Sequence, residues 1–372
     1  MPKISLIPRQ HTPTWLSAAS LVGGLVLGLF LATLVLIGNG VDFKGIINEF
    51  VLYSFTNSRG LAQTLTKATS LLMVGMASAV ALKLRFWNIG VDGQVWLGAI
   101  AATGVAVHNL GPDDSRLLLM AVFAIGAGAL WIGIPVFLRL RLGVNEVIST
   151  LMLSYVAFLV AQHFLYGDWR DPSTSFPVTE TFDPASEQLA RVGFGHLHSG
   201  VWIAVGSALL ISYLMLFSRF GFYLTTVGLN PRGAKAAGLP VVTIIVSATL
   251  IAGGLCGLAG FVVVAGQEYR LTQFVAHGFT FSAILIAFLA RFNPVAVIPV
   301  SFVVAGMFTA GDTLKTFYQL PLSVILVVES LILLSVVAVD FFARYRVSVL
   351  REIHSGPGAV TESAHAATRE TR

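Results

Sequence analysis

Long apolar stretches recur through the 372-residue chain and constrain its fold more than any other feature. Only 11% of the residues are charged, whereas a soluble domain carries about 25%. Because a transmembrane helix needs about 20 apolar residues, we predict an all-α polytopic protein with about ten transmembrane helices, solvated by membrane lipid. The expected spans cover about 16–38, 61–82, 94–109, 117–138, 147–166, 200–218, 241–266, 278–290, 295–311 and 322–341.

These stretches form one membrane domain between two polar ends. We expect residues 1–15 to be a cytoplasmic N-terminus, residues 16–342 to be the transmembrane domain, and residues 343–372 to be a polar cytoplasmic tail. The first span exceeds the roughly 7–15 apolar residues of a secretory signal, so we expect it to remain uncleaved. The segment 167–199 is rich in Pro, Ser, Thr and Gly and should form an ordered cap or a docking loop.

Basic residues favour one side of the predicted membrane. When the N-terminus is placed inside, cytoplasmic segments hold 15 of the 23 Lys and Arg residues, as the positive-inside rule requires. Both termini are then cytoplasmic. These loops account for the net charge of +5, so we expect no nucleic-acid partner. The one cysteine, Cys256, excludes a disulfide within the chain and a multi-cysteine metal site.

The cytoplasmic connection at 224–241, LTTVGLNPRGAKAAGLPV, carries two glycines, Gly228 and Gly233, at the spacing of a phosphate-binding loop. A working loop needs a preceding strand and a Lys directly after the second Gly, and both are missing. The sequence instead predicts a short helix that begins at an Asn-Pro pair, ends at a Gly, and presents small and basic residues to a partner. An ordinary cytoplasmic loop is the alternative. The residues concerned are Asn230, Pro231, Arg232, Gly233, Ala234, Lys235 and Gly238.

A second stretch, LRFWNIGVDGQVWLGAIAA at 84–102, brings polar residues to the start of the third span. Asn88, Asp92 and Gln94 follow Trp87 there. Irregular polar backbone is tolerated at the membrane only where it is buried in protein or lines water. Asp92 is therefore either a residue of a solute pathway or a cap for the third span, where the helix dipole stabilises a carboxylate.

A third stretch, 141–164, carries polar residues into the fifth span. Asn145 and Glu146 open this span, and Tyr155 lies further along it. A polar stripe in an apolar helix favours a bundle interior or a solute pathway, and hydrogen bonds between helices are the alternative. Glu146 could also be solvated or paired with Arg141.

Two other polar positions are candidates for a pathway. Glu329 lies in the middle of the last span, where a charge costs about 2.5–3.5 kcal/mol and should face the bundle, be paired or be protonated. Gln273 follows Glu268 and Arg270 near the expected outer mouth. That segment could line an entrance or form a polar connection.

Motifs for catalysis are missing from the sequence. Neither H-E-x-x-H nor G-x-S-x-G occurs, and the eight histidines are scattered. We therefore expect no enzyme active site, no metal and no cofactor bound by this chain. A membrane-embedded enzyme, the remaining alternative, would lack a catalytic constellation.

Four stretches together resemble the permeases of ABC importers of the simple-sugar and nucleoside type. They are FWNIGVDGQVWLGA, GVNEVISTLMLSY, TTVGLNPRGAKAAGLPV and FTFSAILIAFLARFNPVAV. The resemblance covers about residues 60–340 and extends to ribose-type and branched-chain amino-acid permeases. The form of residues 88–94 is closest to the nucleoside branch. The family usually has Glu at the position of Asp92 and Phe or Leu at that of Trp87, and these departures leave the solute open.

The resemblance implies a type II-like importer fold and a role for the segment 220–240. In such permeases this loop holds the coupling helix, which docks in a cleft of the ATPase subunit. ATP and Mg would bind to that partner, and alternating access would move the solute. The resemblance also implies a second permease in a heterodimer. An extracytoplasmic substrate-binding lipoprotein would deliver nucleosides to the bacterial inner membrane.

Two other transport hypotheses remain. An ABC permease for simple sugars would use the same architecture with another solute. A secondary transporter driven by protons would use Glu329 and the polar outer entrance. The two mechanisms differ in their need for ATP and for partner subunits.

Overall fold

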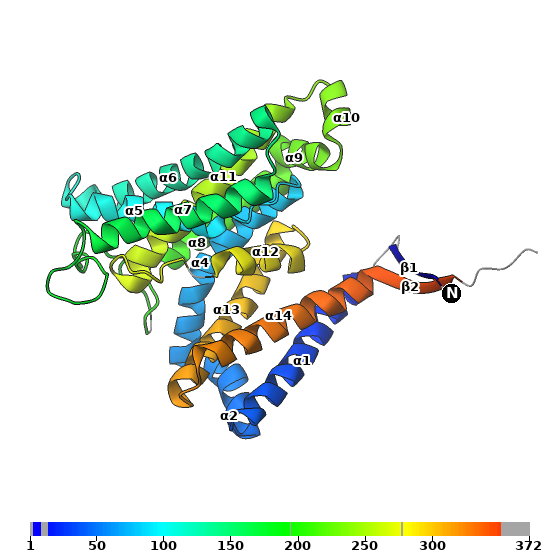
Figure 1. The fold of residues 1–372 in the computed structure, drawn as a ribbon, viewed down its shortest axis with the longest axis horizontal. Helices are drawn as coiled ribbons and strands as arrows, with labels where there is room; N and C mark the ends of the chain where they lie inside the picture. The colour runs from blue at the N-terminus through cyan, green and yellow to red at the C-terminus, as the bar shows by residue number, and fades with distance from the viewer. Residues whose placement is uncertain (1–2, 9–13, 194, 277, 351–372) are drawn as a thin grey trace, which may run out of the picture. The chain divides into compact units, whose positions relative to one another are not determined.

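The computed structural model describes residues 3–8, 14–193, 195–276 and 278–350, and these residues are mainly helical (Figure 1). They divide into two compact units. The first comprises the described residues up to Leu29 together with those from Ile332 onward. The second runs from Phe30 to Leu331 and contains most of the helices.

Each expected span coincides with a helix of the structure. By length and composition, seven helices of the described chain could cross a membrane, and three further apolar helices are shorter. The ten helices that match the expected spans are α1 (Thr14–Gly38), α4 (Ser58–Lys83), α5 (Val91–Val107), α6 (Asp113–Leu142), α7 (Glu146–Tyr166), α8 (Gly200–Phe217), α11 (Val241–Val262), α12 (Phe279–Leu289), α13 (Pro294–Phe317) and α14 (Leu322–Arg344). The chain is therefore a multi-pass membrane protein.

Several elements were not predicted from hydropathy, because they are short or amphipathic. They are α2 (Phe43–Ile47), α3 (Ser54–Thr56), α9 (Arg219–Leu229), the π-helices η1 (Asn48–Tyr53) and η2 (Val263–Glu268), and the strands β1 (Lys3–Pro8) and β2 (Tyr345–Leu350). The predicted short helix is present as α10 (Pro231–Ala236).

In the first unit, the two ends of the chain pair with each other. Strand β1 pairs with β2 in antiparallel register, so that Lys3 faces Leu350. The adjoining helices pack closely, because Gly24 has no side chain to separate it from Val336: a Cβ at Gly24 would lie 2.5 Å from the Val336 Cα. The buried Ser20 hydroxyl also donates to Asp340 Oδ1 at 3.2 Å.

In the second unit, α11 packs most extensively against α6 and α5, while α4 packs against α13 and α12. Glycines bring the first group into backbone contact. A Cβ at Gly98 of α5 would lie 2.3 Å from the carbonyl oxygen of Gly257 on α11, and one at Gly257 would lie 2.0 Å from that of Ala124 on α6. Small residues permit such close approach of membrane helices.

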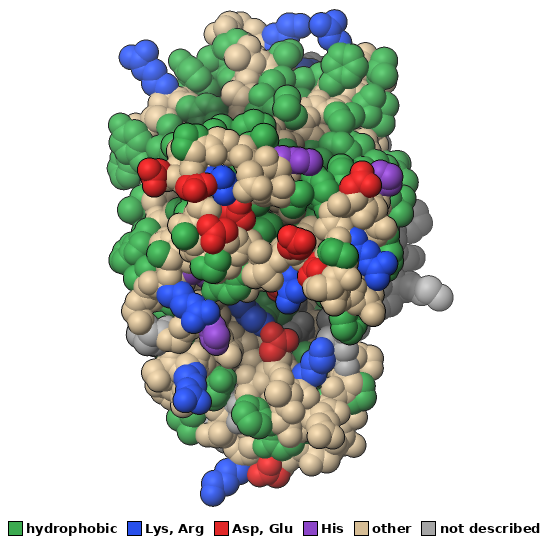
Figure 2. Space-filling model, turned by 90° about the vertical axis from the view of Figure 1, so that its left-hand side faces the viewer, with side chains coloured by type: hydrophobic (Ala, Val, Ile, Leu, Met, Phe, Trp, Pro, Cys, Tyr) green, Lys and Arg blue, Asp and Glu red, His purple; other side chains and the backbone are tan. Residues whose placement is uncertain are grey.

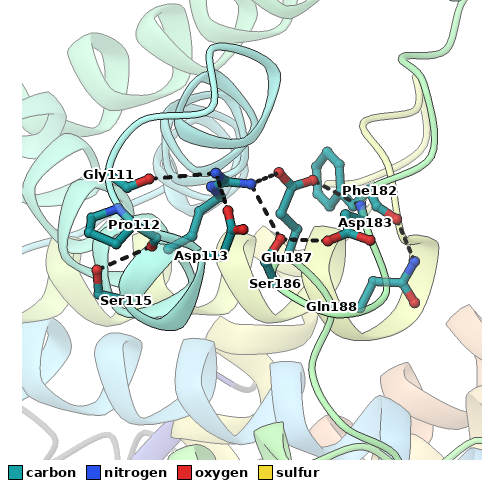
Figure 3. Close-up of polar contacts among 10 residues, drawn as sticks. Gly111, Pro112, Asp113, Ser115, Phe182, Asp183, Ser186, Glu187 and Gln188 are labelled. Atoms are coloured by element: carbon teal, nitrogen blue, oxygen red, sulfur yellow. Dashed lines mark hydrogen bonds and ion pairs between the residues drawn. The ribbon is translucent and has the colours of Figure 1, made fainter.

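The described residues of the segment 167–199 form a cap that is tied to α6 and η2. Its anchor is the buried Arg116 of α6, which donates to Glu187 Oε1 at 3.0 Å and contacts Asp113 Oδ1 at 2.6 Å (Figure 3). Glu187 is also buried, and its second oxygen accepts the Asp183 N–H at 2.9 Å. Hydrogen bonds, chiefly from the Ser186 hydroxyl, lower the pKa of Asp183.

A buried histidine lies at the C-terminal end of the same cap, just before α8 (Gly200–Phe217). His198 is fully buried beside Gly266 of η2, and its Nδ1 accepts the Gly200 N–H at 3.1 Å. Burial lowers the pKa of His198 to about 4, so the ring is neutral at physiological pH. Figure 2 shows the end of the molecule that carries the cap, with charged side chains across the middle of the face among hydrophobic ones.

Candidate functional site

Helix α10 lies between α9 and α11 and begins at a residue that serves two helices. The Asn230 N–H donates to Thr226 O at 3.1 Å and so ends α9, while its Oδ1 accepts the Gly233 N–H at 2.9 Å and starts α10. Pro231 holds the first helical position, where its missing N–H costs nothing. A Cβ at Gly233 would lie 2.9 Å from Asn230 Nδ2, so the glycine leaves room for the cap.

The C-terminal end of α10 is closed by a Schellman motif. The Leu239 N–H donates to Ala234 O and the Gly238 N–H donates to Lys235 O, both at 3.0 Å. Gly238 has a φ of +81°, which glycine adopts without strain. Both ends of this six-residue helix are therefore fixed by local hydrogen bonds.

The exposed surface of α10 is basic. Arg232 and Lys235 are exposed, and Leu229 of α9 exposes 66% of its surface beside them. Ala234, expected among the docking residues, is 1% exposed and packs into its own chain. The helix therefore presents its two cations and its glycines, while the alanine methyl holds it in place. Figure 1 shows α10 at one end of the helix bundle, beyond α9.

The polar stretch before α5 is a closed hydrogen-bond network. The buried amides of Asn88 and Gln94 pair reciprocally at 3.0 and 3.1 Å. The Ile89 N–H donates to Thr150 Oγ1, and the Gly93 N–H donates to Ser154 Oγ. Asn88 and Gln94 therefore satisfy each other's amides inside the fold.

Asp92 joins two helix starts. Its carboxylate accepts the Thr280 N–H at 2.9 Å, and its own N–H donates to the Thr280 hydroxyl at 3.0 Å. Asp92 therefore caps α12, across the fold, whereas the expected cap was for its own helix α5. The N-termini of two helices meet at this carboxylate, and their dipoles offset part of the cost of burying it.

A cavity of about 370 Å³ opens beside this junction. Its walls are mostly aromatic and apolar, with a few polar groups, which is typical of sites for small organic molecules. Its polar and aromatic lining comprises Asp92, Trp96, Ser154, Tyr155, Phe158, Thr280 and Phe281. Asp92 and Tyr155 were predicted from the sequence. Trp96, Phe158 and Phe281 were missed, because aromatic residues in an apolar span give no polar signal.

The remaining pathway candidates are dispersed. Trp87 is 43% exposed and packs near Phe288, with ring centroids 5.7 Å apart. Asn145 caps α7 by accepting the Val147 N–H at 2.9 Å. Glu146 pairs with Arg139 at 3.1 Å, and this differs from the suggested partner Arg141.

Gln273 lines a separate cavity of about 350 Å³, together with Glu268 and Arg270 as the segment's polarity suggested. Glu329 lies on α14, but its side chain falls outside the described part of the structure. The structure thus brings Asp92 and Tyr155 together in one cavity. It places Trp87, Asn145, Glu146 and Gln273 elsewhere.

Comparisons with known proteins add an independent line of information. A protein family described as "Branched-chain amino acid transport system / permease component" matches residues 60–337. The glucose ABC transporter permease protein TsgB13 of Haloferax volcanii is 31% identical over 93% of this chain and 94% of its own length.

Two further relatives carry nucleoside names. The guanosine ABC transporter permease protein NupP of Bacillus subtilis is 28% identical, over 84% of this chain and 90% of its own. The nucleoside ABC transporter permease protein NupB of Lactococcus lactis is 25% identical, over 74% and 78%. The similarity therefore extends across nearly the whole membrane domain.

Proposed function

Since the chain belongs to the family of branched-chain amino acid transport permeases, we propose that it is the membrane subunit of an ATP-driven importer that couples to its ATPase through α10. The single observation that carries this proposal is the geometry of α10. Its backbone ends are fixed, and its two cations are exposed and bound to no acidic residue of the described chain. A rigid cationic helix of this kind can dock into an acidic groove of a partner.

The proposed topology has about ten crossings, with α10 and both chain ends in the cytoplasm of a bacterial cell and the chain in the inner membrane. The pairing of β1 with β2 supports this arrangement, because paired strands must lie on the same side of a membrane. The excess of Lys and Arg on that side also supports it.

A permease that couples to an ATPase needs partner subunits, and we propose three of them. An ABC ATPase would bind ATP and Mg and would dock at α10. A second, unlike permease would complete the membrane pair, and an extracytoplasmic lipoprotein would deliver the solute to the outer face. Alternating access would then carry the solute past the cavity at Asp92 and Tyr155, without catalysis by this chain.

Nucleosides are the proposed solutes. The motif at residues 88–94 and two relatives named for guanosine or nucleosides support this choice. The aromatic cavity at Asp92 suits a planar base, because aromatic rings stack on one another. Simple sugars are the second candidate, since a relative named for glucose is 31% identical over 93% of the chain.

Reconstitution tests the proposal. The chain is placed in proteoliposomes with its ATPase, second permease and lipoprotein, and uptake of radiolabelled guanosine and glucose is measured with and without ATP. In the control experiment, the proteoliposomes contain this chain alone and a proton gradient is imposed across their membrane. We expect uptake only in the complete, ATP-supplied system. Proton-driven uptake by the chain alone would replace the proposal with a secondary transporter.

A further inference from the structure

An ion pair joins two of the membrane-spanning helices. Lys67 of α4 pairs with Asp312 of α13, and its ammonium also donates to Phe308 O at 3.3 Å. Lys67 lies about 14 Å along α4 from the helix start, at about 1.5 Å per residue. Charged groups at such depth normally face the bundle interior or water, because hydrocarbon solvates them poorly.

A cavity supplies that environment. It measures about 430 Å³ and lies among α4, η2, α12 and α13. Phe274, Phe279 and Phe308 give it aromatic walls. Its polar groups converge from separate elements and are Lys67, Ser70, Gln267, Glu268, Ser282 and Asp312. This combination of apolar walls and a few converging polar groups is typical of a small-molecule site.

The cavity adjoins a second one that reaches the cap. Gln267, Glu268 and Phe274 line both this cavity and the neighbouring one of about 350 Å³, which reaches Thr174 in the cap. The amide of Gln267 is held at the junction, since its Nε2 donates to Ser70 Oγ at 2.6 Å and to Thr66 O at 3.2 Å. The cavity at the ion pair therefore shares part of its wall with a cavity that reaches the cap.

We propose that this cavity, the α4–α13 cavity, is a second solute-binding site that takes a neutral molecule bearing hydroxyl groups on an otherwise apolar frame. The proposal rests on the proposed function in naming nucleosides and sugars as the molecules concerned. The cavity at Asp92 lies on α5, α7 and α12, and the α4–α13 cavity shares only Gly278 with it.

The chemistry of the lining selects the ligand. Hydroxyl groups can donate to the carboxylates of Asp312 and Glu268 and to the side-chain oxygen of Gln267, and they can accept from the Lys67 ammonium. Phe279 and Phe308 offer faces on which a base or a sugar ring packs. Two carboxylates and one ammonium disfavour an added anion, so phosphorylated forms of the same molecules should be excluded.

Cysteine protection tests the site. Cys256 is replaced by Ser, and Ser282→Cys is introduced in the complete transporter in proteoliposomes. A membrane-impermeant methanethiosulfonate reagent is then applied from the cap side. Thr316→Cys is the matched control, since Thr316 is exposed on α13 one turn beyond Asp312 and lies outside the cavity lining. We expect guanosine or glucose to slow modification of S282C and to leave T316C unchanged, while guanosine monophosphate and glucose 6-phosphate protect neither.

A second variant tests whether the Lys67–Asp312 ion pair contributes to solute binding. Asp312→Asn should raise the guanosine or glucose concentration needed for protection about tenfold, because the hydrogen-bond acceptor loses its charge. Failure of S282C to react, or equal reaction with and without both solutes, overturns the site even where wild-type uptake is normal. Equal protection by the phosphates overturns the charge selection. Protection in a complex that shows no ATP-driven uptake keeps the site and rejects the proposed function.

Discussion

The two polar connections at α10 and at 167–199 use their charges in opposite ways. In the cap, Arg116 and Glu187 are turned inward and neutralise each other, with less than a tenth of either side chain exposed. On α10, Arg232 and Lys235 are exposed, and the helix is held by backbone hydrogen bonds, by Asn230 and by the buried Ala234. Charge therefore stabilises the cap, whereas the exposed charges of α10 are available for the docking proposed above.

The largest expected effect is on the cap. Arg116→Met leaves Glu187 buried without its cationic partner and should lower the free energy of unfolding by about 3–5 kcal/mol. Thermal unfolding of the purified chain and proteolysis of the 167–199 segment measure this. The control is Arg191→Met, which removes an exposed cation of the same segment and should change stability by less than about 0.5 kcal/mol. If both substitutions lowered the free energy of unfolding equally, the buried Arg116–Glu187 pair would not be what stabilises the cap.

Charge reversal on α10 should abolish function without unfolding. Arg232→Glu with Lys235→Glu should reduce ATP-driven uptake and ATPase co-purification about a hundredfold, because docking to an acidic groove becomes repulsive. The exchange Arg232→Lys with Lys235→Arg keeps both charges and should retain uptake within a few-fold. The double reversal should leave thermal unfolding unchanged. Normal uptake by the reversed variant would refute coupling through these cations.

The cap should weaken in acid. The pKa of His198 is about 4 in the folded chain and about 6.5 when exposed, so between these values the unfolded state binds the additional proton. Stability therefore falls as pH falls through that window, by about 2 kcal/mol between pH 7 and pH 4.5. Cap proteolysis measured across this range should show the fall in wild type and much less of it in His198→Asn. An unchanged pH dependence in the variant would contradict this assignment.

The smallest expected effect is on the α10 cap residue. Asn230→Ala removes the acceptor of the Gly233 N–H and should destabilise the helix by about 1 kcal/mol. Hydrogen exchange at the Gly233 amide should accelerate, with a modest loss of uptake. Asn230→Asp keeps an acceptor oxygen and should restore slow exchange. Equal exchange in all three chains would show that the partner alone orders this helix.

The membrane-spanning helices could be predicted because a long apolar run is solvated well only by lipid. Helix α10 could be predicted from the residues that begin and end it. The Asn-Pro start and the Gly238 end are interactions within a few residues, so the sequence displays them directly. Helix α9 escaped prediction because its amphipathic pattern lies beside a longer apolar span.

Partners distant in sequence could not be predicted. Asp92 was expected either to line a solute pathway or to cap its own helix, but the helix N–H that it accepts belongs to Thr280, 188 positions away. Nothing in the sequence around Lys67 indicates that it pairs with Asp312, and nothing around Ala234 indicates that its side chain is buried. Hydropathy reports whether a residue is apolar, whereas these outcomes depend on which helices become neighbours.

The glycine contacts of α11 have a mechanical consequence. Because Gly257 meets the backbones of Gly98 and Ala124 directly, few side chains lie between α5, α6 and α11 there to absorb a push by changing rotamer. We therefore expect the three helices to move as one body. Helix α11 begins a few residues after α10, so force applied at α10 should reach the Asp92 end of α5 with little damping.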